Sequence, residues 1–247
     1  MPEHVALDKR KSSSSAVETV KTLVYAILIA VVVRTFLFEP FNIPSGSMKP
    51  TLLVGDYLFV SKYAYGYSRW SFPWGILPFE GRVFGSLPER GDVAVFKRPG
   101  ENVDYIKRVI GLPGDRIQMK SGRLYINGAE VPQDPDGTFN DLNEGSVPMF
   151  RETLPGGRVH DILDRYPDGP MDDTREFLVP PDHVFMMGDN RDNSQDSRDP
   201  SLGYVPLENL VGRAEILFFS TDGSAGVLEP WGWPFATRFD RLFNPIR

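Results

Sequence analysis

The sequence predicts a mainly β protein, with an antiparallel sheet or barrel-like domain and long irregular insertions, preceded by one N-terminal transmembrane helix. Two observations lead to this fold class. From Pro40 onward, short β-branched or aromatic segments are separated by turn residues, and the chain of 247 residues contains 23 Gly and 22 Pro. Before that point lies one apolar stretch, residues 22–38, whose single charge is Arg34. No long amphipathic helical pattern follows it, so we expect strands to build the large domain.

The composition excludes several classes of protein. Hydrophobic residues make up 41% and charged residues 24%, a globular balance that rules out wholesale disorder. The formal net charge is -6, so the chain lacks the basic excess that phosphate backbones select, and we expect no nucleic-acid partner. Cysteine is absent, which removes disulfides, thiolate metal sites and cysteine nucleophiles. With only three histidines and no cluster of metal ligands, we expect neither a metal nor a cofactor.

Residues 22–38 form the expected membrane span and set the expected domain boundaries. At about 1.5 Å per residue, a helix of this length reaches roughly 25 Å, at the lower end of what crosses a bilayer. A buried core helix and a cleaved secretory signal are the alternatives, but no small-x-small cleavage pattern follows the stretch. Positive charge is concentrated before the span, at Lys9, Arg10, Lys11 and Lys21. We therefore expect residues 1–21 to be a cytoplasmic tail and residues 39–247 to be one domain across the membrane.

Within that domain the strand patterns are short. They cover residues 56–61, 92–97, 104–111, 123–126, 183–187 and 212–219. Asn127 and Gly128 follow one of these patterns and predict a tight hairpin, because both residue types accept the positive φ angles of such a turn. Residues 63–90 and 133–181 are expected to be long irregular insertions, the first aromatic and the second rich in Asp, Gly and Pro.

Ser45 and Ser47 flank Gly46 in a turn just beyond the expected span. In an extended or turned backbone their side chains project nearly the same way, and Gly46 allows another backbone to approach closely. One serine could attack a substrate while the other donates a hydrogen bond. Taken alone, the motif is more typical of a plain linker leaving the bilayer, because such turns are common.

Lys107 is the candidate base. Strand alternation places it on one face of 104–111 and Arg108 on the other, so at least one cation loses water if the strand is central. A desolvated lysine loses part of its preference for the charged form and, once neutral, can take the proton of a serine. The alternative is that both cations protect an exposed sheet edge.

The segment 188–198 mixes acidic, basic and amide side chains. A calcium-loop interpretation fails because Ser197 and Gly203 stand where the EF-hand pattern requires Gly and Glu. The alternatives are a solvated polar loop and an ion-paired loop in which Ser194 is available to a buried amine. In the second case, the candidate partners are Asp189, Asp192 or Asp196 with Arg191 or Arg198.

Other serine chemistries fit poorly. The chain contains neither a Gly-x-Ser-x-Gly elbow nor a Ser-x-x-Lys pair, which argues against α/β-hydrolases and penicillin-binding enzymes. A histidine triad is also disfavoured, because His4 lies on the wrong side of the expected membrane and no motif surrounds His160 or His183.

Taken together, and in this order after a membrane anchor, these stretches resemble the bacterial type I signal peptidase, or leader peptidase, family. The resemblance is carried by Pro44-Ser-Gly-Ser-Met48 with Pro50-Thr-Leu, Arg90-Gly-Asp-Val-Ala-Val-Phe96, Tyr105-Ile-Lys-Arg-Val-Ile-Gly-Leu-Pro-Gly-Asp115, and Gly188-Asp-Asn-Arg-Asp-Asn-Ser194 with Asp196-Ser-Arg198. It implies a serine endopeptidase that removes signal peptides from exported preproteins after a small-x-small sequence. It also implies a place in the bacterial cytoplasmic membrane, with the catalytic domain on the periplasmic side.

The resemblance assigns roles to individual residues. Ser47, directly before Met48, is the implied nucleophile, and Lys107 is the implied general base. The hydroxyl of Ser45 would form the oxyanion hole beside the Ser47 N–H. Support for the dyad is implied for Ser194, which would orient the lysine amine, and for Asp196 with Arg198. Asp189, Arg191 and Arg108 are implied to be structural.

Substrate and partners follow from the same resemblance. An extended signal peptide would add as a strand to a sheet edge, over shallow apolar pockets that admit alanine. The implied pocket residues are Phe41, Ile43, Leu52, Tyr105 and Ile106. The aromatic stretch 63–84, with Trp70 and Trp74, could seat the domain in lipid headgroups together with Trp231 and Trp233. The alternative is that these side chains pack within the insertion. We expect a monomer whose partners are signal peptides and membrane lipid.

Two alternatives remain open on the sequence. A self-cleaving repressor shares the Ser/Lys logic on a β-rich domain, but it would need an N-terminal DNA-binding module where this chain has its apolar stretch. An anchored β-rich binding protein is the other alternative, in which the serine and lysine would be incidental.

Overall fold

The computed structural model describes residues 8–72, 81–141, 145–166, 168–226 and 229–247, with side chains from residue 16 onward. The first seven residues of the expected cytoplasmic tail lie outside the described residues, as does Trp74 of the aromatic stretch.

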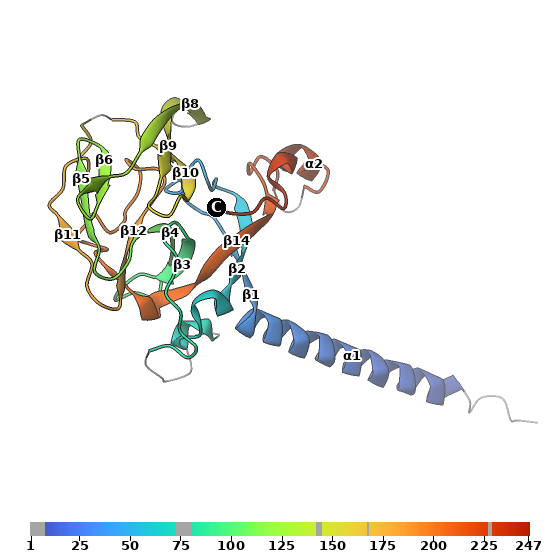
Figure 1. Ribbon diagram of the computed structural model, residues 1–247. Helices are drawn as coiled ribbons and strands as arrows, with labels where there is room; N and C mark the ends of the chain where they lie inside the picture. Colours follow the sequence, from blue (N-terminus) through green and yellow to red (C-terminus); the bar gives the residue numbers. More distant parts are fainter. Residues whose placement is uncertain (1–7, 73–80, 142–144, 167, 227–228) are drawn as a thin grey trace, which may run out of the picture.

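The N-terminal helix α1, Asp8–Phe36, begins well before the expected span. Its segment Ala16–Phe36 is long and apolar enough to cross a membrane. That segment contains no Gly or Pro to interrupt the helix, and β1 begins at Phe38, just ahead of Pro40. In Figure 1, α1 projects away from the β domain. Its apolar side chains are exposed, among them Leu23, Tyr25 and Ile29 at 59%, 64% and 64%. A helix that is apolar all round without protein packed against it suits a lipid environment.

The largest sheet has seven strands and curls into half a barrel (Figure 1). The order is β1-β2-β14-β3-β4-β12-β13, and every neighbouring pair is antiparallel. The strands are β1 Phe38–Asn42, β2 Asp56–Ser61, β3 Val93–Lys97, β4 Asp104–Gly111, β12 His183–Met187, β13 Val205–Pro206 and β14 Leu210–Ser220. The strand patterns at 56–61, 104–111 and 183–187 are confirmed at both ends, and those at 92–97 and 212–219 fall on β3 and β14.

A four-stranded sheet holds the predicted hairpin. Its order is β11-β5-β6-β7, with β11 Phe177–Leu178, β5 Arg116–Lys120, β6 Arg123–Ile126 and β7 Ala129–Glu130. Asn127 and Gly128 have φ angles of 54° and 82°, and Ile126 pairs with Ala129 across the turn. Positive φ at both central positions is what a tight two-residue hairpin requires, so this prediction is confirmed.

The insertion 133–181 is more regular than its composition suggests. It contains a three-stranded antiparallel sheet, ordered β10-β9-β8, from β8 Gln133–Asp141, β9 Gly145–Thr153 and β10 Val159–Leu163. Most side chains of β8 are exposed or half-buried, so the strand lacks the apolar alternation that marks a strand in sequence. Backbone pairing with β9 forms it instead.

Short helical turns complete the described chain. They are η1 Lys62–Tyr65, η2 Arg69–Ser71, η4 Leu207–Asn209, α2 Trp233–Ala236 and η5 Phe239–Arg241. Within the described part of the insertion 63–90, η1 and η2 are the only helical segments, as an irregular insertion predicts.

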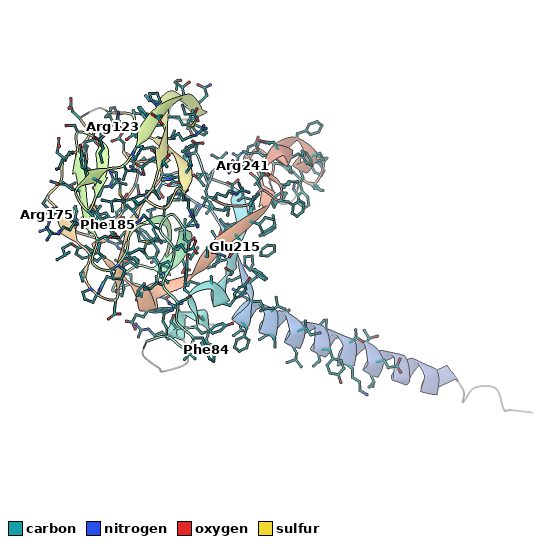
Figure 2. All side chains as sticks on the ribbon, in the orientation of Figure 1. Phe84, Arg123, Arg175, Phe185, Glu215 and Arg241 are labelled. Atoms are coloured by element: carbon teal, nitrogen blue, oxygen red, sulfur yellow. The ribbon has the colours of Figure 1, made fainter. Side chains whose placement is uncertain are left out.

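The core consists of three clusters of buried apolar side chains. Figure 2 shows Phe185 inside the β domain, where it is fully buried, and Phe84 at the surface, where it is 87% exposed. The cluster nearest the serine turn joins β1, β2, β3 and β14, and it includes Met48 and Leu52, both with 0% exposure. Burying these two side chains pins the chain on either side of residues 49–51 to the sheet.

Candidate active site

Ser47 and Lys107 lie side by side and are both buried. Ser47 lies in the turn that follows β1, and Lys107 lies on β4, opposite Ala94 of β3. Lys107 Nζ and Ser47 Oγ are 2.5 Å apart, and the two residues are only 4% and 8% exposed. Lys107 and Arg108 are both buried, at 4% and 0% exposure, so the interpretation of the two cations as solvated guards of an exposed edge is wrong.

Burial lowers the pKa of Lys107 to about 8, because the ammonium form loses its water. The carboxylates of Asp196 and Asp189 oppose this shift, and the Arg198 guanidinium adds to it. Near neutral pH, a useful fraction of this amine is therefore uncharged and able to accept a proton from the serine hydroxyl at hydrogen-bond distance.

The loop after β12 holds the serine turn from one side. Asn190 donates from its backbone N to Ser47 O and from Nδ2 to Gly46 O, both at 3.1 Å. Thr51 donates to Asp189 Oδ2 at 2.6 Å. These bonds fix the turn's carbonyls and leave the Ser47 N–H without a hydrogen-bond partner among the described residues. Ser45, two positions earlier, is exposed.

Gly188 allows this loop to approach the turn. A Cβ built on it would lie 2.2 Å from Ser194 Oγ and 2.5 Å from Ser47 O, distances that real Cβ atoms do not show. Only glycine fits there. Ser194 is 8% exposed and packs beside Gly188, but its hydroxyl forms no hydrogen bond with Lys107. Its role in orienting the amine therefore stays a prediction.

Asp196 and Arg198 form a buried ion pair inside the same loop. Arg198 donates to the two carboxylate oxygens at 2.9 and 2.8 Å, and the Gly188 N–H donates to Asp196 Oδ2 at 3.0 Å. Burial alone would raise the pKa of Asp196, but the charge and hydrogen bonds of Arg198, together with the Gly188 N–H bond, outweigh it and hold that pKa below its ordinary value. The carboxylate therefore stays ionised and braces the loop beside Lys107.

Arg108, on the other face of β4, pairs with Asp189. Nε and a terminal guanidinium nitrogen donate to the carboxylate at 2.8 and 2.7 Å, and another donates to Gly91 O at 2.8 Å. Arg108 is 0% and Asp189 1% exposed. Neither touches the serine hydroxyl, which is consistent with a structural role for both.

Two residues of the insertion sheet, Glu152 and His160, also pack against the loop after β12. The sequence did not predict either as a partner. Arg191 pairs with Glu152 on β9 at 2.9 and 2.7 Å instead of with an aspartate of its own loop. His160 on β10 lies 3.4 Å from the same carboxylate. Burial lowers the pKa of His160 to about 4, so the imidazole is neutral. No local sequence motif marks Glu152 or His160 as a partner of the site. Only the pairing of the insertion strands brings the two side chains to it.

Four of the five expected pocket residues share one cluster. Phe41, Ile43, Leu52 and Ile106 pack together with Met48. Tyr105 belongs to the neighbouring cluster, and its ring lies 5.7 Å from Lys107 Nζ. A cavity of about 460 Å³ adjoins this region, with Phe41 and Trp70 in its lining. Trp70 packs against the same cluster of buried side chains, which favours packing on the domain over contact with lipid.

One cluster of possible metal ligands occurs among the described residues. Carboxylate oxygens of Asp164, Asp172 and Asp192 lie within 4.8 Å of one another. Burial and the two neighbouring carboxylates raise the pKa of Asp164 to about 6, so it keeps a proton in mildly acidic solution. Backbone N–H groups of residues 165, 166 and 169 already donate to Asp192 and Asp172.

Comparison with known proteins identifies the family. Residues 16–219 match the family described as signal peptidase, peptidase S26. The chain belongs to this family. The signal peptidase I of Rickettsia typhi is 40% identical over 97% of both chains, and that of Rickettsia prowazekii is also 40% identical over 97% of both. A crystal structure of a signal peptidase I from Enterococcus faecalis is 24% identical, covers 52% of this chain and 97% of that one, and gives a TM-score of 0.32.

Membership settles the class of reaction. Signal peptidases of this family remove signal peptides as serine proteases, so this chain is a signal-peptide-removing serine peptidase. Its apolar helix α1 is consistent with membrane anchoring. Family membership therefore argues against both the self-cleaving repressor and the anchored binding protein.

Proposed function

We propose that this chain is a membrane-anchored signal peptidase that uses Ser47 as its nucleophile and Lys107 as its general base. The observation that carries the proposal is the buried pair itself, with Nζ and Oγ 2.5 Å apart and the pKa of Lys107 lowered to about 8. Serine is a weak nucleophile at neutral pH, and a neutral lysine at this distance supplies the missing base.

The reaction begins when neutral Lys107 takes the hydroxyl proton of Ser47. Oγ attacks the scissile carbonyl carbon, and the carbonyl oxygen becomes an oxyanion. The Ser47 N–H and the Ser45 hydroxyl donate hydrogen bonds to that oxyanion. The C–N bond then breaks, the leaving amine takes the proton from the Lys107 ammonium, and an ester remains on Ser47.

Hydrolysis of this ester uses the same residues. Lys107, neutral again, takes a proton from water while the water oxygen attacks the ester carbonyl carbon. A second oxyanion forms in the same place and collapses, and Ser47 Oγ regains the proton from Lys107. Asp196 and Arg198 hold the loop throughout, with Ser194 beside the amine.

The substrate adds as a strand along β4. β4 pairs with β3 over Asp104–Arg108 but with β12 only from Arg108 to Gly111. Within the described residues, one edge of β4 before Arg108 is therefore open to an extended peptide, next to the nucleophile. Ile43 and Leu52 are 3% and 0% exposed, so they close the floor of the pockets. Shallow pockets admit alanine and exclude larger side chains, which supports small-x-small specificity.

The domain sits on the periplasmic face of the bacterial cytoplasmic membrane, with the N terminus in the cytoplasm. The four Lys and Arg residues that precede the apolar stretch 22–38, in the first half of α1, favour this orientation. Three aromatic side chains near α2 support contact with headgroups: Trp231, Trp233 and Phe235 are 74%, 48% and 88% exposed. Protease digestion of right-side-out and inverted vesicles tests the orientation, because the domain must be cut from the periplasmic side only.

Cleavage of a secretory preprotein by the detergent-solubilised full chain tests the dyad. Wild type is expected to cut after the small-x-small site, and Ser47→Ala and Lys107→Ala are expected to leave the preprotein intact. Exposed Ser146→Ala and Lys120→Ala serve as matched controls and should cleave like wild type. Thermal melts confirm that each variant is folded. Cleavage by folded Ser47→Ala or Lys107→Ala would disprove the assignment.

A further inference from the structure

A second lysine touches the serine turn and connects it to the insertion sheet. Lys49 lies two residues after Ser47, and its Nζ forms an ion pair with the carboxylate of Asp141, the last residue of β8. Each side chain is only 9% exposed. The contact joins positions 92 residues apart in sequence, and it links the insertion strand β8 to the turn that carries the nucleophile.

The side chain of Lys49 lies across Gly46. A Cβ built on Gly46 would be 3.0 Å from Lys49 Cε and 3.3 Å from its Nζ, and the Lys49 N–H donates to Gly46 O at 3.1 Å. Asn190 Nδ2 donates to the same carbonyl at 3.1 Å. The peptide groups of Gly46 are thus held by Lys49 and by the loop after β12.

Gly46 separates the two groups that would bind the oxyanion, the Ser45 hydroxyl and the Ser47 N–H. Donor direction matters strongly in such a site, because a misplacement of about 1 Å costs roughly 10²-fold in rate. Ser45 is exposed, so burial does not hold it in place. The Lys49 side chain, lying across Gly46 and fixed by its ion pair with Asp141, can hold Ser45 in place instead, as a brace.

We propose that Lys49 and Asp141 are positioning residues that hold the Ser45–Gly46–Ser47 turn so that its donors are aimed at the oxyanion. The inference rests on the proposed Ser/Lys function. It also assigns a role to the insertion 133–181, whose strand β8 delivers Asp141 to the active site. The pair acts through the oxyanion donors rather than through Lys107, whose charge balance depends on Asp196, Asp189 and Arg198.

Kinetics of the full chain in detergent test this role. Lys49→Met and Asp141→Asn are each expected to lower kcat by about 10-fold to 100-fold, below the loss of roughly 10² to 10³ for a whole donor. KM should change less than about twofold, because the brace acts in the transition state. Lys49→Met/Asp141→Asn should be no worse than the more damaged single variant, since both remove one contact. Lys49→Arg, which keeps the charge, should stay within about threefold of wild type.

Two comparisons separate positioning from a general weakening of the insertion. Asp136 lies on the same strand β8 and pairs with Arg151 within the β8–β9 ladder, so Asp136→Asn should leave kcat near wild type. In a Ser45→Ala background, Lys49→Met should cost less than about threefold, because one donor that it aims is already absent. The pH of half-maximal activity should not move in any of these variants.

The proposal is overturned if folded Lys49→Met turns over like wild type, or if its loss is as large in the Ser45→Ala background. It is also overturned if Asp136→Asn is equally damaged, if KM rises at constant kcat, or if the pH profile shifts. Failure of the proposed function gives a different result, namely cleavage by Ser47→Ala or Lys107→Ala. An inactive Ser47→Ala beside a fully active Lys49→Met refutes the brace alone.

Discussion

Lys107, the proposed catalytic base, is expected to lower the free energy of unfolding of the protein. Its pKa falls from 10.5 in its ordinary state to about 8 in the folded chain. The unfolded state therefore binds more protons than the folded state between these two values, and the free energy of unfolding must rise with pH across that window. Replacing the amine with an uncharged side chain of similar length removes the penalty. Lys107→Met should thus abolish cleavage and stabilise the fold.

The size of the effect follows from the two pKa values. A shift of this kind is worth about 1.4 kcal/mol per pKa unit, so the penalty at pH 7 is about 3 kcal/mol. It declines to about 2 kcal/mol at pH 9 and about 1 kcal/mol at pH 10, as the unfolded lysine also loses its proton. Lys107 is 4% exposed, so solvent does little to screen these values.

Urea unfolding of wild type and Lys107→Met at pH 7, 9 and 10 measures the difference. The expected result is a variant that is more stable at pH 7, by an amount that shrinks steadily toward pH 10, with an unchanged m-value. Exposed Lys120→Met is the control and should show no such pH-dependent gain. A variant less stable than wild type at pH 7, or a gain that does not vary with pH, would refute the burial argument.

Further predictions concern activity and stability. The kcat/KM of wild type should rise about tenfold per pH unit below pH 8 and level off above it, because Lys107 must be neutral; a stopped-assay pH series checks this. Gly188→Ala should lower kcat by roughly 10² or more in the cleavage assay, because its Cβ meets the Ser47 carbonyl. Ser45→Ala should cost about 10² to 10³ in kcat at constant stability. Asp189→Asn leaves the buried Arg108 charge uncompensated and should cost about 3 to 5 kcal/mol in urea unfolding.

Local patterns in the sequence were sufficient for much of this molecule. Alternation and turn residues marked β2, β4 and β12 at their true ends, because those strands are short, buried and bounded by Gly, Pro or Asp. Asn127 and Gly128 specified their hairpin through backbone sterics alone. The sequence also marked the segments of Ser47, Lys107 and the loop after β12 as candidate functional sites, because each is rich in reactive side chains.

Tertiary structure alone decided how these pieces work together. Lys107 and Arg108 looked alike in sequence, and only the burial of β4 showed that one meets Ser47 and the other meets Asp189. Asp141 and Glu152 carry no local signal, because only the pairing of β8, β9 and β10 across the insertion brings them to the site. Sequence by itself thus determined the reactive residues and the strands that bear them. Long-range packing determined their charge states and their partners, because desolvation and ion pairing depend on neighbours far along the chain.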